Sequence, residues 1–216
     1  WLTAASVLAK LEPDDPPNLI YVPERGVAPD KIVADVRACY ERLGYCVVAV
    51  SEGLKDDQGN DIAAGRTNEV DAFGHARKGG VVEYLEALLR DAFGFSIRYD
   101  KPGYLQRSFG ELISSTDREE AYEVGRAAVR AASNGDTDKE VVLVRVPGPT
   151  YHIDMGLAPL DQVANIERKL PAEFINAQGN GVTDAFVEYA RPLIGEPLMP
   201  YARLQAHRVT VRTRHS

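Results

Sequence analysis

The chain has 216 residues, of which 44% are hydrophobic, enough to bury a substantial core in one large domain or two small lobes. Its net charge of −7 argues against a dedicated nucleic-acid-binding protein, because such domains are usually basic. No apolar run approaches the roughly 18 residues of a membrane span, and the first ten residues lack the basic segment of a secretory signal. We therefore predict a cytoplasmic protein that binds neither nucleic acid nor membrane.

The first fifty residues alternate between helical and strand patterns. Residues 2–11 and 29–43 have apolar side chains at helical spacing, and Gly44 ends the second helix. Residues 18–23 and 46–50 are short apolar runs, typical of strands covered on both faces. This alternation predicts a parallel sheet with right-handed crossovers.

The rest of the chain predicts further helices and strands, joined by one long polar segment. Residues 52–70 read as a flexible insertion or lid, and the residues from 197 onward as an irregular arm. The predicted helices are 81–93, 117–133 with Thr116 as its N-cap, and 184–192; the predicted strands are 95–99, 140–146 and a hairpin partner at 151–155. The two cysteines, Cys39 and Cys46, lack metal-ligand spacing, so we expect reduced core thiols rather than a disulfide.

The segment Arg98-Tyr-Asp-Lys-Pro-Gly-Tyr-Leu-Gln-Arg107 concentrates three cations and two phenols around a Pro-Gly turn. The planar guanidinium of arginine matches the oxygens of a phosphate, and ligands of open α/β sheets bind at the carboxyl ends of strands. An anion-binding loop for a phosphorylated small molecule is one interpretation. A charged surface turn is the other, and the residues alone do not separate the two.

Four motifs occur along the chain in a characteristic order: Asn18-Leu-Ile-Tyr-Val-Pro-Glu24, Val47-Val-Ala-Val-Ser-Glu-Gly53, Asp71-Ala-Phe-Gly-His-Ala-Arg-Lys-Gly-Gly80 and Gly103-Tyr-Leu-Gln-Arg107. As an ordered set they resemble the C-terminal half of a 6-phosphofructokinase, in the bacterial branch that includes pyrophosphate-dependent enzymes. The resemblance runs from about Trp1 to Leu204. It implies an α/β fold with a doubly wound, mostly parallel sheet, and we interpret the chain as part of a longer protein.

The resemblance also implies an organisation of the chain. Residues 1–103 would form the fructose 6-phosphate-binding lobe, residues 104–183 would return to the donor-binding lobe, and residues 184–204 would form a C-terminal arm. The basic residues 205–216 are expected to be a disordered tail rather than a nucleic-acid-binding arm.

The site residues implied by the resemblance are four. Glu24 would contact the hydroxyls of fructose 6-phosphate, and Arg107 would hold the 6-phosphate with Tyr104 beside it. Arg98 resembles the arginine that reaches the 6-phosphate of a neighbouring subunit's substrate. Lys101 and Gln106 are weaker candidates. The run around His75 departs from the family pattern at Arg77 and Lys78, so we expect it to be structural.

The resemblance implies an enzyme that phosphorylates the 1-hydroxyl of fructose 6-phosphate, using Mg²⁺ with ATP or pyrophosphate as donor, in a homo-dimer or homo-tetramer. The catalytic base, the donor loop and the metal ligands of that family precede the part matched here, so no catalytic residue and no metal ligand is assigned to this chain, and it is expected to be inactive alone. Two alternatives remain: a non-catalytic sugar-phosphate sensor or scaffold subunit, and an unrelated periplasmic-type sugar-binding domain.

Overall fold

The computed structural model describes residues 1–63, 80–196 and 202. The predictions for residues 64–70, for the run around His75 and for the tail at 205–216 lie outside these residues. Within them, none of the helices is long and apolar enough to cross a membrane.

The first part of the chain forms a parallel βαβ unit, as predicted. Strand β1 (Leu19–Tyr21) leads into helix α2 (Pro29–Leu43), which returns the chain to strand β2 (Val48–Val50). The strands pair in parallel, with Leu19 opposite Val48 and Tyr21 opposite Val50. Proline at the first position of α2 and the left-handed Gly44 (φ 78°) at its end explain the bounds of this helix.

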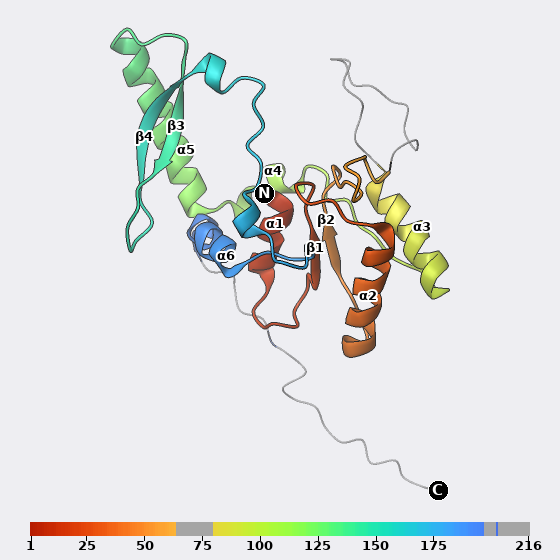
Figure 1. The fold of residues 1–216 in the computed structure, drawn as a ribbon. Helices are drawn as coiled ribbons and strands as arrows, with labels where there is room; N and C mark the ends of the chain where they lie inside the picture. Colours follow the sequence, from red (N-terminus) through yellow and green to blue (C-terminus); the bar gives the residue numbers. More distant parts are fainter. Residues whose placement is uncertain (64–79, 197–201, 203–216) are drawn as a thin grey trace, which may run out of the picture.

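Side chains of β1 and the residue after it alternate between two hydrophobic clusters. Leu19 and Tyr21 pack with buried residues of α2 and of helix α3 (Val81–Phe93). Ile20 and Val22 pack on the other side with helices α1 (Leu2–Ala5) and α6 (Asp184–Ala190). Helices therefore cover both faces of the sheet, as the predicted doubly wound α/β fold requires (Figure 1).

A helix and a hairpin project from this part of the molecule (Figure 1). Helix α5 (Ser115–Ser133) lies beside the antiparallel strands β3 (Lys139–Arg145) and β4 (Ile153–Pro159). We call residues 115–159 the hairpin unit, and the other described residues from 1 to 196 the body. The predicted helix and hairpin are confirmed, with shifted ends. The predicted N-cap is wrong: Ser114 caps α5 by accepting a hydrogen bond from the Asp117 N–H, while the Thr116 hydroxyl donates to the Pro192 carbonyl.

The short elements complete the fold. They are the 3₁₀ turns η1 (Ser6–Ala9), η2 (Gly110–Leu112), η3 (Leu160–Gln162), η4 (Ala172–Phe174) and η5 (Arg191–Ile194), and the single-turn helix α4 (Leu105–Ser108).

Two sequence predictions about strands are wrong. Residues 95–99 are not a strand but an irregular segment after α3. Strand β2 is half-exposed rather than covered on both faces. The predicted flexible insertion after β2 is ordered as far as residue 63. Leu54 is fully buried. Asp56 accepts hydrogen bonds from the N–H groups of Gln58 and Asn60, which closes a tight turn.

Both cysteines are free thiols, as predicted. Cys39 is buried on α2 and Cys46 is half-buried just before β2. Burial, and then a hydrogen bond with Cys39, raise the pKa of the Cys46 thiol to about 12.

Candidate functional site: the carboxyl ends of β1 and β2

Glu24 follows the carboxyl end of β1 by three residues, and its two carboxylate oxygens have different surroundings. Oε1 accepts a hydrogen bond of 2.9 Å from the Leu170 N–H. Oε2 is buried and has no hydrogen-bond partner among the described residues. A buried carboxylate oxygen without a donor is costly, so natural proteins rarely keep one unless a ligand or solvent completes it. Glu24 Oε2 thus keeps unused acceptor capacity, as does the second carboxylate oxygen of Glu83 on α3.

The loop that carries Glu24 is fixed by its two neighbours in sequence. The Arg25 guanidinium donates to the carbonyls of Asn176 (3.0 Å) and Ala177 (2.8 Å). Gly179, at a φ of 73°, allows this approach, because a Cβ there would lie 2.9 Å from Arg25 Nε. A Cβ on Gly26 would lie 2.1 Å from the Asp56 carbonyl oxygen. Both residues are therefore structural supports of the Glu24 loop.

Residues 170–181 form the other support of the loop, although the sequence placed them only within the segments expected to return to the donor-binding lobe. Leu170 supplies the N–H that holds Glu24. The turn at 176–181 places the Asn180 carbonyl to accept from the Ile20 N–H, on the edge of β1 away from β2. The signal in the sequence was the polar run Asn176-Ala-Gln-Gly-Asn-Gly181, whose composition is typical of a tight turn.

Tyr104 and Arg107 are brought together, as their i, i+3 spacing predicts. Gly103 turns the chain at a φ of 61°, Tyr104 occupies the N-cap position of α4, and the Arg107 N–H donates to the Tyr104 carbonyl. The Arg107 guanidinium lies 5.9 Å from the centre of the Tyr104 ring, and both side chains are exposed. Within the described part of the chain Arg107 makes no ion pair, so its donors are available to an anion.

Arg98 lies apart from this pair. It is exposed, on the irregular segment after α3, and lines a groove beside β2. No hydrogen bond or ion pair among the described residues joins Arg98 or Glu24 to Tyr104 and Arg107. In Figure 1, however, α4 and the carboxyl ends of β1 and β2 lie on the same side of the molecule.

Lys101, a weaker candidate, has a structural partner. Its ammonium group forms an exposed ion pair with Glu83 on α3. The hydrogen bond in this pair lowers the pKa of Glu83 and raises the pKa of Lys101. The pair ties the Pro-Gly turn to α3, so Lys101 supports the loop that presents Tyr104 and Arg107.

A metal site is not found in the part of the chain that the structure describes. No group of three or more histidine, cysteine, aspartate or glutamate side chains there could hold a metal ion. The described residues offer the Glu24 carboxylate and an exposed arginine–tyrosine pair, groups that can accept from hydroxyls and donate to an anion.

Comparison with known proteins gives a consistent answer. No family model matches the chain. It is 42% identical over 203 residues to the pyrophosphate–fructose 6-phosphate 1-phosphotransferase of Xanthomonas campestris pv. campestris, covering 93% of this chain and 48% of that protein. It is 41% identical over 215 residues to the enzyme of the same name from Rhodospirillum rubrum, covering 97% of this chain and 53% of that protein.

A solved structure agrees with these sequences. The crystal structure of a pyrophosphate-dependent phosphofructokinase from Marinobacter aquaeolei superimposes with a TM-score of 0.74 at 32% identity, over 94% of this chain and 47% of that chain. The fold is thus that of a sugar-phosphate kinase of the phosphofructokinase type. These matches confirm the resemblance to the 6-phosphofructokinase family, and the relatives named here are pyrophosphate-dependent. The chain spans about half the length of the relatives it matches.

Proposed function

We propose that this chain supplies the fructose 6-phosphate-binding part of a 6-phosphofructokinase, which transfers a phosphoryl group from pyrophosphate to the 1-hydroxyl of fructose 6-phosphate. The observation that carries this proposal is the carboxylate of Glu24. One of its oxygens is fixed by the Leu170 N–H and the other is buried without a donor, at the edge of the sheet where α/β proteins bind ligands. The names of the relatives support the reaction.

Each site residue has a role in this proposal that its surroundings allow. Glu24 accepts a hydrogen bond from a sugar hydroxyl through Oε2. Arg107 holds the 6-phosphate with charge-assisted hydrogen bonds, and Tyr104 lies against the same group. Arg98 reaches the 6-phosphate bound to a second subunit of a homo-dimer or homo-tetramer. Binding energy at the 6-phosphate thereby positions the distant 1-hydroxyl for reaction.

The phosphoryl donor and the metal in this proposal are taken from the phosphofructokinase family. The relatives favour pyrophosphate over ATP as the donor. The described residues do not form a site for Mg²⁺, so the proposal assigns the metal, the donor and the catalytic base to other parts of the polypeptide. We accordingly expect the 216-residue chain to show no phosphoryl transfer by itself.

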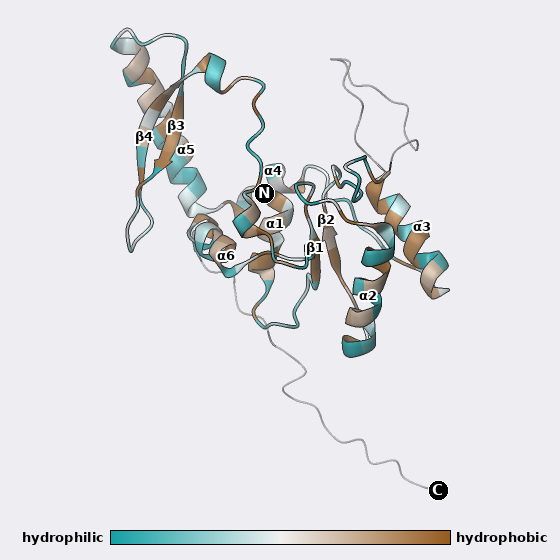
Figure 2. Cartoon of the chain, in the orientation of Figure 1, coloured by the Kyte–Doolittle hydropathy of each residue, from teal (hydrophilic) through white to brown (hydrophobic). Residues whose placement is uncertain are grey.

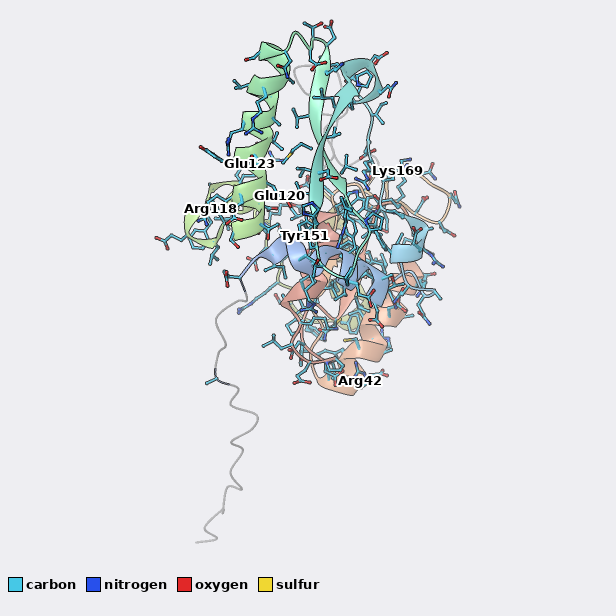
Figure 3. The ribbon with its side chains drawn as sticks, turned by 90° about the vertical axis from the view of Figure 1, so that its left-hand side faces the viewer. Arg42, Arg118, Glu120, Glu123, Tyr151 and Lys169 are labelled. Atoms are coloured by element: carbon cyan, nitrogen blue, oxygen red, sulfur yellow. The ribbon has the colours of Figure 1, made fainter. Side chains whose placement is uncertain are left out.

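The test combines activity with a matched pair of arginine variants. A full-length polypeptide containing this sequence is assayed with fructose 6-phosphate and Mg²⁺, with pyrophosphate and ATP in separate reactions. Arg107→Met should raise the KM for fructose 6-phosphate by roughly 10- to 150-fold, because a hydrogen bond to a charged group contributes about 1.5–3 kcal/mol. Arg42→Met is the control: Arg42 pairs with Asp14 near the carboxyl end of α2, far from the site, and should leave KM unchanged (Figure 3).

Three outcomes separate the candidate functions. Turnover with pyrophosphate alone supports the proposal, and turnover with ATP alone would correct the donor. Binding of fructose 6-phosphate without turnover with either donor would replace the proposal by the sensor or scaffold function. An unchanged KM in Arg107→Met would remove Arg107 from the site.

A further inference from the structure

Tyr104 and Arg107 lie on a stretch of chain that packing hardly holds. Every side chain described within residues 98–110 is exposed. The stretch is held at its two ends: Ile97 packs against the hydrophobic cluster between β1 and helices α2 and α3, and the Ser114 hydroxyl donates to a backbone carbonyl of η5. Hydrophobic burial therefore does not set the position of the arginine–tyrosine pair.

The Pro-Gly turn and α4 form a local unit held by its own hydrogen bonds. The Pro102 carbonyl accepts from the first N–H of α4, and the Arg107 N–H donates to the Tyr104 carbonyl. Proline restricts its own φ, and Gly103 has a φ of 61°, which few residues other than glycine adopt. The shape of this unit is thus defined, and what remains to be set is its position on the body.

One polar contact connects this unit to the body. Within the described part of the chain, residues 95–101 form no backbone hydrogen bond. Between Ile97 and Ser114, the ion pair of Lys101 with Glu83 is the only hydrogen bond or ion pair that the described residues make with an element outside this stretch. The position of the turn therefore depends on the side chain of Lys101.

Glu83 is a suitable anchor because its own position is fixed. It lies in the first turn of α3, where the helix dipole favours a carboxylate. The buried side chains of Val81 and Leu85 hold this turn of the helix in the core. Oε1 of Glu83 accepts from the Lys101 ammonium group, and Oε2 is buried. The ion pair thus joins the turn to a helix that the core holds in place.

The three cations of the loop differ in their partners. Arg98 and Arg107 form no ion pair among the described residues, whereas Glu83 neutralises the charge of Lys101. An ammonium group that already has a carboxylate partner gains less from a phosphate than a free guanidinium does. The structure therefore separates an arginine that is free to bind an anion from a lysine that is already bound.

We propose that Lys101 and Glu83 are positioning residues for the sugar phosphate: their ion pair places the arginine–tyrosine pair against the 6-phosphate, and neither side chain contacts the substrate. The inference rests on the proposed function, in which Arg107 holds that phosphate. It has a consequence of definite sign. Removal of Glu83 would strengthen a lysine that binds the phosphate directly, because it removes a competing partner, but would weaken substrate binding if the pair acts by positioning.

The test is a double-mutant cycle in a full-length polypeptide containing this sequence. The KM for fructose 6-phosphate is measured with pyrophosphate and Mg²⁺, and the Kd for fructose 6-phosphate alone by calorimetry. Lys101→Met, Glu83→Gln and the double variant should each raise both constants by roughly two- to fivefold, the range expected for a partly exposed ion pair. The double variant should be no weaker than either single variant, because all three lack the same contact. The kcat should stay unchanged.

Two further variants make the test specific. Lys101→Arg keeps a cation opposite Glu83 and should bind fructose 6-phosphate as the unmodified protein does. Lys139→Met is the matched control, because Lys139 pairs with Asp136 in the hairpin unit and its side chain has the same 41% exposure as that of Lys101. This variant should change neither KM nor Kd.

The sign of the Glu83→Gln effect decides between positioning and direct contact. A constant or lower KM in Glu83→Gln, with an increase of roughly tenfold or more in Lys101→Met, would make Lys101 a ligand of the phosphate and overturn the inference. Additive effects in the double variant, or a parallel fall in kcat, would overturn it as well. Binding without turnover would reject the proposed reaction, while the pattern of Kd values still decides the inference. An unmodified protein that does not bind fructose 6-phosphate would reject both.

Discussion

The body and the hairpin unit differ in how they bury side chains. Every buried hydrophobic residue among those that the structure describes lies in the body, and all but Cys39 belong to two clusters on either side of β1. The hairpin unit has none: helix α5 and strands β3 and β4 contain no buried residue. Figure 2 nevertheless shows hydrophobic colour along β3. The body thus has its own core, whereas the hairpin unit carries apolar surface that its own elements do not bury.

The hairpin unit is attached to the body by polar contacts near α6. Arg145 donates to the Tyr189 carbonyl, and its guanidinium stacks between the rings of Tyr151 and Tyr189. The Tyr151 hydroxyl donates to Glu120, as the neighbouring positions of these side chains in Figure 3 show. A two-stranded hairpin is marginal by itself and needs packing against a further element, here helix α5. The packing of α5 and the contacts with Tyr189 therefore hold the hairpin to the body.

The largest expected effect comes from removing a core side chain of the body. Phe186 is 1% exposed and packs with Phe174 and Trp1. Phe186→Ala should lower the free energy of unfolding by about 3–5 kcal/mol, through lost burial and a residual cavity. Val129→Ala, on α5 at 68% exposure, should change it by less than about 0.5 kcal/mol. Denaturant unfolding followed by circular dichroism measures both, and equal effects would contradict the distinction between the two regions.

A glycine in each region gives the next comparison. A Cβ on Gly26 would collide with the Asp56 carbonyl at 2.1 Å, in the backbone that supports Glu24. A Cβ on Gly156 in β4 would meet the methyl groups of Val144 and Val142 at 2.9 and 3.2 Å. Backbone yields less readily than side chains of an exposed hairpin, so Gly26→Ala should cost about 1–3 kcal/mol and Gly156→Ala less. Denaturant unfolding of both variants tests this order. A larger loss of stability in Gly156→Ala than in Gly26→Ala would mean that the hairpin unit is the more rigid of the two regions.

The elements that the sequence predicted well are those whose signals are local. Helix α3 matches its predicted bounds, and α2 begins at Pro29 and ends before Gly44 as expected, because proline and glycine act on their own backbone. The strand expected at 95–99 was wrong for a different reason. Its side-chain alternation is local, but strand structure depends on a neighbour that the sequence of this segment cannot supply.

The candidate site shows the same division. The i, i+3 contact between Tyr104 and Arg107 follows from helical spacing alone. The resemblance pointed to Glu24, but its fixed and free oxygens depend on Leu170, which is 146 residues away in sequence. The roles of Arg25 and Gly26 likewise depend on residues 176–179 and 56. Such long-range contacts leave no periodic signal in the chain.

Two aspartates, Asp35 in the body and Asp136 in the hairpin unit, allow the two regions to be compared through a charged side chain. Asp35 accepts hydrogen bonds from the Tyr21 hydroxyl, the Lys31 ammonium and the Asn180 side-chain amide, which joins α2 to β1 and to the 176–181 turn. Burial raises the pKa of Asp35, but these three hydrogen bonds outweigh it and hold the pKa below its ordinary value. Asp35→Asn should cost about 1–2 kcal/mol at neutral pH. Asp136→Asn, which breaks the exposed pair with Lys139 beside β3, should cost about 0–1 kcal/mol.

The pH dependence of the Asp35 effect has a definite sign. A carboxylate whose pKa is lower in the folded protein stabilises it above the unfolded pKa of about 4, and this contribution is lost as the pH falls through the folded value. The stability difference between the unmodified chain and Asp35→Asn should therefore be full at pH 6–7 and shrink below about pH 4. Unfolding curves at several pH values measure it, and a constant difference would show that the charge of Asp35 is not what stabilises the body.

The smallest expected effect concerns the thiols, which report on the body alone because Cys39 and Cys46 are the only two cysteines of the chain. With its pKa raised to about 12 by burial and by Cys39, the Cys46 thiol is almost entirely protonated at pH 8. Only the thiolate reacts, and burial, the larger cause of the raised pKa, remains in Cys39→Ala, so its single thiol should react with a disulfide reagent at least tenfold more slowly than a free cysteine. Denaturant should accelerate the reaction only as the body opens. If the acceleration instead occurs at a lower denaturant concentration, the one at which the helix signal of the hairpin unit is lost, the two regions unfold as one.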